Sequence, residues 1–517
     1  MTAPVNVSDE ERVLLDDADE WFDAHRQELV TELSDLVNIA SVSDDSAPEP
    51  GSPYGVGVRA VFDHVLRRAA DWGFRSTDFN GYAIDVRYPA SDEGTEERWD
   101  NDIALVSHLD VVPEGDGWDW PAFEAFEKEG VVVGRGTADN KGAAIVDLFL
   151  LRFFNSRRHG FRHPLRVLLG GAEETTLGDM TYVVGNHGAP FQAVVTDSPF
   201  PVNNAQKGHL DVDVIIPAGP ELSGFSAGVS YNSVPGHAAI TLHGVNAGHV
   251  NEVLNTLDPE LVRRIKVSGL GGGLDGSVEL SATGITGHAA FPEGSLNAVG
   301  VLFETLDQAA LLNGADATAG AALAEWLRTP YGDGTSIAYS DDVSGRTTQN
   351  AGIVRGQGDE LVVHFDIRYA VTQSATSVLS ELANHAERIG GRLGEVNDSS
   401  PYFVDADDPR IRQLLGSFDA VMGTHAKAIS MGGGTHARVI PNAINFGPGF
   451  IRGYVEGATR AIASPPEFIA EGKGTPHGAD EWVSIEDLKS AFLIYVLGIT
   501  RLDRTLQVPV SGTTPLG

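Results

Sequence analysis

The sequence contains no cysteine among its 517 residues. Disulfide bonds and thiolate chemistry are therefore excluded, and any metal site must be built from nitrogen and oxygen ligands. Long apolar runs are also missing, since none approaches the ~20 residues that a transmembrane helix needs. The segment Met1–Asp17 is polar and acidic and lacks the basic and apolar regions of a signal peptide. We therefore expect a cytoplasmic protein that does not bind membranes.

Basic residues are scarce. The 36 lysines and arginines are outnumbered by 72 aspartates and glutamates, which gives a formal net charge of −36. This excess repels phosphate backbones and anionic membranes at long range, so we expect no nucleic-acid partner. An acidic, solvated surface keeps a protein soluble without identifying its substrate. The length and the hydrophobic content of 42% are enough for a sizeable core and several domain-sized units.

Three short apolar runs each lead to residues that can bind a metal. They are Ile103–Val106 before His108, Leu165–Leu169 before Glu173 and Glu174, and Ala193–Val195 before Asp197. Such runs are typical of strands buried on both faces of a parallel sheet. Lys141–Phe154 predicts the crossover helix between the first two strands. We predict an α/β domain with a mixed, mostly parallel sheet flanked by helices, and a ligand site beyond the carboxyl ends of its strands.

The remaining elements predict an α+β region inserted into this domain. Helices are expected at Ser8–Val37 and Val56–Trp72 before the inserted region, and at Arg410–Met422 and Ile485–Leu502 after it, with a strand at Ala443–Phe446. The inserted region contains the predicted strands Leu210–Ile216, Ala238–Leu242 and Leu361–Tyr369 and the predicted helices Val299–Leu312 and Ala375–Ile389. We place the first domain at residues 1–207 and 395–517 and the inserted domain at residues 208–394.

Two motifs offer candidate metal ligands with supporting groups. His108 and Asp110 lie two positions apart directly after a strand, so the carboxylate can hold the second imidazole nitrogen. Asp139 precedes the predicted helix at Lys141, and a carboxylate with two free oxygens can bridge two cations. Taken alone, the first motif is more typical of a turn with a surface histidine, and the second of a helix cap.

Glu173 and Glu174 are adjacent acids after a buried strand, so one can bind metal while the other faces a water molecule. Paired like charges are unfavourable near a low-dielectric site unless cations compensate them, although exposure to solvent is the simple alternative. Asp197 and His477 indicate little individually. Together these residues match a two-metal hydrolase, in which imidazole and carboxylate groups hold cations ~3.5–4 Å apart.

Five linked motifs resemble the co-catalytic zinc peptidase family that contains carnosinase, carboxypeptidase G and succinyl-diaminopimelate desuccinylase. In chain order they read SHLDVVPEGDGW, GRGTADNKG, GGAEET, VVTDSPFPV and PHGADEWVSIEDL. Within this family the chain is most similar to the bacterial PepV-type dipeptidases, and the resemblance covers nearly the whole chain. It implies two Zn²⁺ ions per chain, with Mn²⁺ or Co²⁺ as alternatives.

The resemblance also implies a role for each residue of the metal site. The ligands would be His108, Asp139, Glu174, Asp197 and His477. Asp139 would bridge the two ions and be followed by a cis peptide bond to Asn140. Asp110 would orient His108. Glu173 would be the general base that takes a proton from a metal-bound water and passes it to the leaving amine.

The inserted domain resembles the lid of PepV-type enzymes. In relatives, the positions of Asn232 and His288 stabilise the tetrahedral intermediate, and that of Arg368 holds the C-terminal carboxylate of the peptide through parallel hydrogen bonds. Gly433 and Gly434 would allow a close backbone approach to substrate. The alternatives are an outward residue on an alternating strand for Arg368 and a plain flexible loop for the glycines. A lid that supplies His288 within the same chain implies a monomer.

These features predict a metal-dependent dipeptidase whose partner is a small peptide with free termini. The alternative is an N-acyl-amino-acid deacylase that uses the same dinuclear site. A non-catalytic binding module with the same scaffold is a third interpretation. The presence of Glu173 beside all five ligand residues argues against it.

Overall fold

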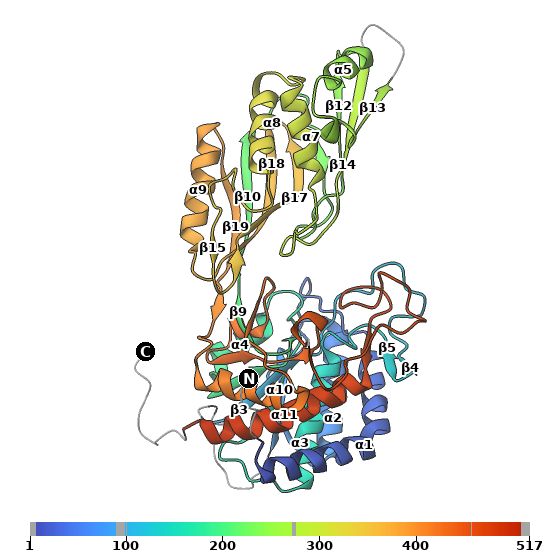
Figure 1. Ribbon diagram of the computed structural model, residues 1–517, viewed down its shortest axis with the longest axis vertical. Coiled ribbons are helices and arrows are strands. Elements are labelled where there is room, and N and C mark those ends of the chain that lie inside the picture. Colours follow the sequence, from blue (N-terminus) through green and yellow to red (C-terminus); the bar gives the residue numbers. More distant parts are fainter. Residues whose placement is uncertain (1–6, 89–98, 100, 271–275, 456, 508–517) are drawn as a thin grey trace. The chain divides into compact units, whose positions relative to one another are not determined.

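The computed structural model describes residues 7–88, 99, 101–270, 276–455 and 457–507, and it divides into two compact units (Figure 1). Unit 1 comprises Met1–Asn204, Val404–Ile429 and Gly434–Gly517, and unit 2 comprises Ala205–Phe403 and Ser430–Gly433. Each unit buries its own apolar core. The chain therefore forms two folded bodies, and unit 1 is assembled from segments at both ends of the sequence.

The central sheet of unit 1 has a parallel centre and antiparallel edges. Its strands follow the order β1 (Arg75–Asp78), β2 (Ala83–Tyr88), β6 (Leu165–Gly170), β3 (Ile103–His108), β7 (Gln192–Val195), β22 (Ala443–Asn445) and β9 (Asn203–Gln206). The four strands from β6 to β22 run parallel. Every residue of β3, β6 and β7 is buried, in agreement with their largely apolar sequences. The predicted α/β class with a mixed sheet is confirmed.

Helices cover this sheet, as Figure 1 shows. They are α1 (Asp9–Val37), α2 (Gly55–Asp71), α3 (Lys141–Ser156), α4 (Gly178–His187), α10 (Pro409–Met422) and α11 (Ile485–Thr505). Helices α1, α3 and α11 contact one another, so the first and last helices of the chain pack on the predicted crossover helix. Helix α11 begins where the Ser484 hydroxyl accepts a hydrogen bond from the backbone amide of Asp487.

A small three-stranded sheet joins two distant segments of unit 1. Strand β24 (Trp482–Ser484) pairs antiparallel with β5 (Val131–Val133), which pairs with β4 (Phe126–Lys128). Trp482 lies opposite Val133 in this register. The pairing therefore brings the residues just before β24 alongside the loop that leads into α3.

Unit 2 has an antiparallel α+β architecture. Its five-stranded sheet has the order β11 (Ser226–Ala227), β17 (Thr348–Gln357), β18 (Glu360–Tyr369), β10 (Gly208–Pro217) and β19 (Arg392–Ser399). A second sheet has the order β12 (His237–His243), β14 (Ser277–Thr283) and β13 (Ile265–Leu270). The helices α7 (Ala298–Gln308), α8 (Gly314–Trp326) and α9 (Ala375–Arg388) pack on these sheets. Burial alternates along β10, so one of its faces belongs to the core and the other is polar.

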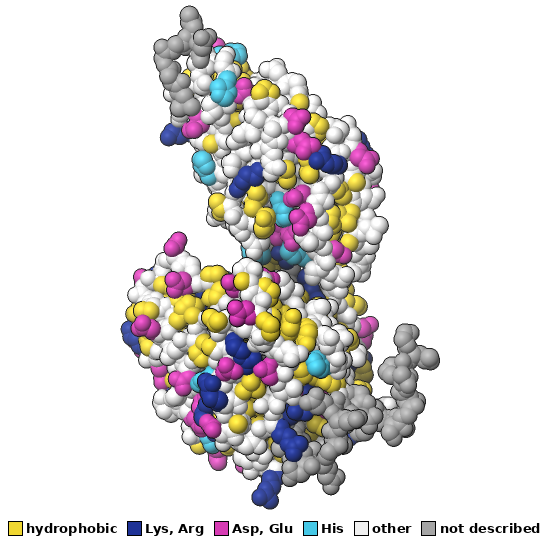
Figure 2. Space-filling model, turned by 180° about the vertical axis from the view of Figure 1, so that it is seen from behind, with side chains coloured by type: hydrophobic (Ala, Val, Ile, Leu, Met, Phe, Trp, Pro, Cys, Tyr) yellow, Lys and Arg dark blue, Asp and Glu magenta, His cyan; other side chains and the backbone are white. Residues whose placement is uncertain are grey.

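One predicted helix ends early. The pattern predicted a helix over Val299–Leu312, but α7 stops at Gln308, because Ala310 has a φ of 48°, in the left-handed region. Acidic side chains are scattered over the surface of both units (Figure 2), as the net charge predicted. Among the residues that the structure describes, no helix has both the length and the apolar character to span a membrane.

Candidate active site

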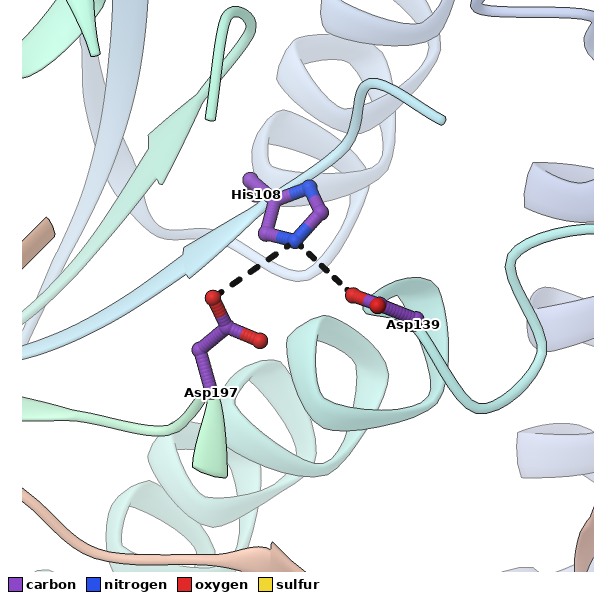
Figure 3. Close-up of side chains that lie close together, drawn as sticks. All are labelled: His108, Asp139 and Asp197. Atoms are coloured by element: carbon purple, nitrogen blue, oxygen red, sulfur yellow. Dashed lines mark hydrogen bonds and ion pairs between the residues drawn. The ribbon is translucent and has the colours of Figure 1, made fainter. Parts of the chain in front are cut away.

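Five acidic and histidine side chains of unit 1 form two groups that share Asp139. In the first group, Nε2 of His108 lies 3.1 Å from Oδ1 of Asp139 and 3.7 Å from Oδ2 of Asp197 (Figure 3). In the second, Nε2 of His477 lies 3.2 Å from Oδ2 of Asp139 and 3.0 Å from Oε2 of Glu174. Each oxygen of Asp139 thus faces a different imidazole. The five residues predicted as ligands lie together.

The fold explains how these residues meet. His108 ends β3, Asp197 follows β7, and Glu174 follows β6, so the carboxyl ends of three neighbouring parallel strands supply three of the five side chains. Asp139 lies just before α3. His477 comes from the segment that precedes β24, more than 300 residues further along the chain.

Asn140 connects three parts of the site. Its Oδ1 accepts a hydrogen bond from the backbone amide of His108 at 3.2 Å. Its Nδ2 donates to the backbone oxygen of Thr196 at 2.9 Å and to Oδ1 of Asp197 at 3.0 Å. The Asp139–Asn140 peptide bond is cis, as the resemblance implied. One amide side chain therefore ties the start of α3 to the ends of β3 and β7.

Asp110 supports the site differently from the sequence prediction. The backbone oxygen of Asp110, at 3.0 Å, accepts the hydrogen bond from Nδ1 of His108, while the carboxylate lies 3.4 Å from that nitrogen. The carboxylate instead accepts hydrogen bonds from the backbone amides of Glu173 and Glu174, at 3.2 and 3.1 Å. Asp110 therefore links the loop after β3 to the loop after β6, and holds both glutamates in place.

The electrostatics of the site favour cations. Burial raises the pKa of Glu174 to about 7 and that of Asp197 to about 6. Burial and the nearby Asp197 carboxylate raise the pKa of Glu173 well above its ordinary range. Oε1 of Glu174 is buried and has no hydrogen-bond partner. Several carboxylates gathered away from water are stabilised by divalent cations, and the nitrogen and oxygen donors present here suit such ions.

Glu481 is a supporting residue that the sequence analysis missed. Its fully buried carboxylate accepts hydrogen bonds from the backbone amides of Gly136, Ala138 and Asp139 at 2.9 to 3.0 Å. It also pairs with Nη1 of Arg135 at 2.7 Å. Glu481 therefore fixes the loop that presents Asp139, the residue common to both groups. Glu481 could have been noticed from the sequence because it lies in the PHGADEW stretch, four residues after His477 and directly before β24.

A second missed residue lies beneath the strand ends. Asp147, on α3, accepts hydrogen bonds through Oδ2 from the hydroxyl groups of Ser107 at 3.1 Å and Thr196 at 2.7 Å. Those residues directly precede His108 and Asp197. Burial raises the pKa of Asp147 to about 8, so its carboxyl group is protonated at neutral pH. It acts as a neutral anchor below two candidate ligands.

Unit 2 contains most of the predicted substrate-binding residues. Nε and Nη2 of Arg368, on β18, bond to both carboxylate oxygens of Asp366 at 2.7 and 2.8 Å. Nη1 of Arg368 donates to the backbone oxygen of Gly432 at 3.5 Å, next to Gly433. The backbone oxygen of Asn232 accepts from the amide of Ala289 at 2.8 Å, so Asn232 lies beside His288. Gly434 belongs to unit 1.

Comparisons with known proteins agree with this architecture. "Putative dipeptidase YtjP" of Bacillus subtilis (strain 168) is 28% identical over 487 residues, which cover 92% of this chain and 97% of that protein. Human carnosine dipeptidase 1 has a similar fold, with a TM-score of 0.55 and 13% identity over 95% of this chain and 99% of that chain. The dipeptidase Dug1p from Saccharomyces cerevisiae gives a TM-score of 0.54 and 14% identity over 95% and 98%.

The family assignment follows from the match to a family model. Residues 104–500 match Peptidase family M20/M25/M40, and this range contains all five candidate ligands and Glu173. The predicted resemblance to carnosinase and the PepV-type dipeptidases is confirmed. This chain belongs to peptidase family M20/M25/M40 and is a hydrolase of that family.

Proposed function

We propose that this protein is a dipeptidase that hydrolyses the peptide bond of short peptides with free termini, using two Zn²⁺ ions. The observation that carries the proposal is the pair of ligand groups that share Asp139. The names of the similar proteins support dipeptides as the substrate class. Mn²⁺ or Co²⁺ could replace zinc, because the donors are imidazole nitrogens and carboxylate oxygens.

The donor set fits two cations. One ion would be held by His108, Asp139 and Asp197, and the other by Asp139, Glu174 and His477. Bound cations would polarise the scissile carbonyl and lower the pKa of the attacking water. The Glu481 carboxylate accepts a hydrogen bond from the backbone amide of Asp139 and would hold this ligand in place.

We assign Glu173 as the general base. It lies next to a ligand group without belonging to either one, and its Oε2 is 3.9 Å from Nε2 of His108. The side chain is 11% exposed, so bulk water is largely kept from it. Glu173 takes a proton from the attacking water and delivers it to the leaving amine. Its backbone amide is held by Asp110, which restricts where the carboxylate can reach.

The residues of unit 2 complete the proposal. Asn232 and His288 donate hydrogen bonds to the oxyanion of the tetrahedral intermediate. Arg368 binds the C-terminal carboxylate of the peptide, with Asp366 holding the guanidinium in one orientation. The backbones of Gly433 and Gly434 approach the substrate closely. In this proposal residues 208–394 form the lid of a monomer, and residues 1–207 and 395–517 form the catalytic domain.

The test combines metal analysis with a substrate panel. The purified protein is assayed with Ala-His and with N-acetylated amino acids, before and after chelation, and its metal content is measured by mass spectrometry. We expect at least two equivalents of metal per chain, hydrolysis of Ala-His, loss of activity after chelation and recovery with Zn²⁺, Mn²⁺ or Co²⁺. Activity on the acetylated substrates alone would replace the dipeptidase with the deacylase. Activity that survives complete removal of metal would refute both.

A further inference from the structure

The polar face of the large sheet in unit 2 carries a ladder of charged residues. Strands β10 and β18 pair antiparallel, and the opposite face of β10 belongs to the apolar core. Three cross-strand pairs lie on the polar face: His209 with Arg368, Asp211 with Asp366, and Asp213 with His364. The proposed function uses only Arg368 and its partner Asp366, which leaves the other four residues without an assigned role.

Three of these residues form a compact group around one nitrogen atom. Nε2 of His209 lies 3.2 Å from Oδ1 of Asp211 and 3.4 Å from Oδ2 of Asp366. This nitrogen is buried and makes no hydrogen bond. The Asp366 side chain is almost completely buried, while those of His209 and Asp211 are 22% and 28% exposed. At these distances a protonated His209 pairs with both carboxylates, whereas the lone pair of the neutral imidazole and the two carboxylate oxygens converge as donors to one cation.

The group has the same composition and spacing as the two groups in unit 1. Each contains one imidazole and two carboxylates. In unit 1 the nitrogen–oxygen separations run from 3.0 to 3.7 Å, and in unit 2 they are 3.2 and 3.4 Å. Ligands bound tetrahedrally at ~2.0–2.2 Å lie about 3.3–3.6 Å from one another. The spacing in unit 2 therefore suits a shared cation.

Neighbouring residues hold this group in place. Arg368 bonds to both oxygens of Asp366, which fixes the carboxylate while lone pairs stay free for a cation. On the other side, His364 bonds through Nδ1 to Oδ1 of Asp213 at 2.9 Å, and its Nε2 lies 3.5 Å from Oδ1 of Asp211. Such outer contacts are typical of metal sites, where they orient the ligands.

The charges also favour a divalent cation. Asp211, Asp213 and Asp366 contribute three negative charges, and Arg368 is the one permanent positive charge on this ladder. The carboxylates raise the pKa of His209 and of His364, although burial acts in the opposite direction, so protons and a divalent cation compete for this negative charge. With both histidines neutral the ladder has a net charge of about −2, which one divalent cation would neutralise. Arg368 alone leaves two of the three carboxylates uncompensated.

We propose that unit 2 binds a third divalent cation, such as Zn²⁺, through Nε2 of His209, Oδ1 of Asp211 and Oδ2 of Asp366. Water molecules occupy the remaining coordination positions. The ion crosslinks β10 to β18 and stiffens the strand that carries Arg368. Because Asp366 binds both the ion and the guanidinium, the cation fixes the orientation of Arg368. This site lies wholly within unit 2 and does not depend on the proposed catalytic metals.

The experiment separates the new site from the metals of unit 1. In the full-length chain, the double variant His108→Ala, His477→Ala removes one imidazole from each ligand group of unit 1. Zn²⁺ alone is then titrated by calorimetry and by competition with a chelating dye. We expect one equivalent of Zn²⁺ to remain bound. Adding Asp211→Asn or His209→Gln should weaken this binding by roughly 100-fold or more, because each removes a direct ligand and loss of a merely supporting residue already weakens binding 10–100-fold.

The matched control is Asp213→Asn in the same background. It removes a carboxylate from the same strand and face, two positions beyond Asp211, without removing a ligand of the proposed ion. It should keep the equivalent of Zn²⁺ and weaken its binding less than either ligand variant does, because loss of a supporting residue weakens binding about 10–100-fold. The idea is overturned if the double variant binds no Zn²⁺, or if neither Asp211→Asn nor His209→Gln weakens binding more than Asp213→Asn does. The first result would indicate that the carboxylates share a protonated His209. Circular dichroism establishes that each variant is folded, and the two ligand variants test the site independently.

Discussion

The candidate residues of the two units are held in different ways. In unit 1 the ligand loops are fixed by buried side chains: Asp110, Asn140 and Glu481 are each at most 1% exposed and bond to the backbone of those loops. In unit 2, Asn232 and His288 are both exposed. The difference indicates that unit 1 is organised before substrate binds. The proposed oxyanion donors of unit 2 lie where a small molecule can reach them.

This contrast indicates that the two units have different roles in the proposed reaction. Rigid, buried support suits groups that must hold cations and a base at fixed distances. Exposed polar groups suit contacts that form and break in every catalytic cycle. Changes in unit 1 should therefore lower kcat or the metal content. In unit 2, loss of the oxyanion donors Asn232 and His288 should lower kcat without changing the metal content, whereas changes at Arg368 should act on KM and on the choice of substrate.

The largest effect is expected from Glu173→Gln. The amide cannot accept the proton of the attacking water, so kcat should fall by roughly 10²–10⁴-fold. Neither ligand group loses a member, so the metal content should stay at its wild-type value. Steady-state kinetics on Ala-His together with metal analysis measure both quantities. The control is Glu124→Gln, at an exposed position of the same unit. Unchanged turnover in Glu173→Gln would refute the assigned base.

A smaller effect is expected from Glu481→Gln. The amide keeps the shape but loses the charge that holds three backbone amides and Arg135. Because this residue supports the loop of Asp139 without binding metal, metal affinity should fall by roughly 10–100-fold. Breaking a fully buried ion pair should also lower the free energy of unfolding by about 3–5 kcal/mol. Wild-type metal affinity would show that the loop is held by other contacts.

The sequence predicted the candidate ligands but not every residue that supports them. The positions of His108 and Asp197 at strand ends were predictable because each follows an apolar run typical of a buried strand. The resemblance identified His477, which no local pattern distinguishes from a surface histidine. Glu481 was missed because its role depends on bonds to residues more than 340 positions away. Asp147 was missed because the periodicity of α3 does not show that this acid is buried and protonated.

Unit 2 shows a similar limit to prediction from the sequence. The strand-like run Leu210–Ile216 was enough to predict a strand, and β10 forms there. The run could not show that the polar residues of β10 pair with Asp366 and His364 on β18, because this pairing depends on the register between strands far apart in the sequence. The end of α7 at Gln308 was missed for a local reason, since Ala310 adopts a left-handed conformation that alanine rarely takes.

Arg368→Lys tests the substrate-binding role proposed for unit 2. Lysine keeps the charge but cannot make paired, parallel hydrogen bonds to a carboxylate. We expect KM for Ala-His to rise about tenfold, which corresponds to the loss of one charged hydrogen bond, while kcat changes little. Ala-His with an amidated C-terminus lacks the carboxylate, so its kinetics should be unaffected. Arg392→Lys, an exposed ion pair on the same sheet, is the control. Equal effects on both substrates would contradict the carboxylate assignment.

The smallest effect concerns the helix packing behind the site. Glu11 on α1 bonds to Arg501 on α11 at 2.8 and 3.1 Å, away from every candidate ligand. This hydrogen-bonded pair lowers the pKa of Glu11 from 4.5 to about 2, although burial acts in the opposite direction. A lowered carboxyl pKa stabilises the folded state above pH 4.5, and this stabilisation is lost as the pH falls from 4.5 towards 2. Glu11→Gln should therefore lower the free energy of unfolding at pH 7 by about 1–3 kcal/mol and leave kcat and KM unchanged.

Urea unfolding of the full-length wild type and variant at pH 7, 4 and 3 measures this difference in the free energy of unfolding. The difference should shrink at lower pH, because the Glu11 carboxylate becomes protonated and loses its charge, as the glutamine of the variant already has. Glu10→Gln is the matched control, since Glu10 pairs with Arg504 at 3.0 Å but is 76% exposed. An exposed pair of this kind contributes less than about 1 kcal/mol. A Glu11→Gln effect that stayed constant from pH 7 to 3 would mean that the helix contact depends on packing and not on charge. A loss of activity would mean that α1 and α11 do more than support the sheet.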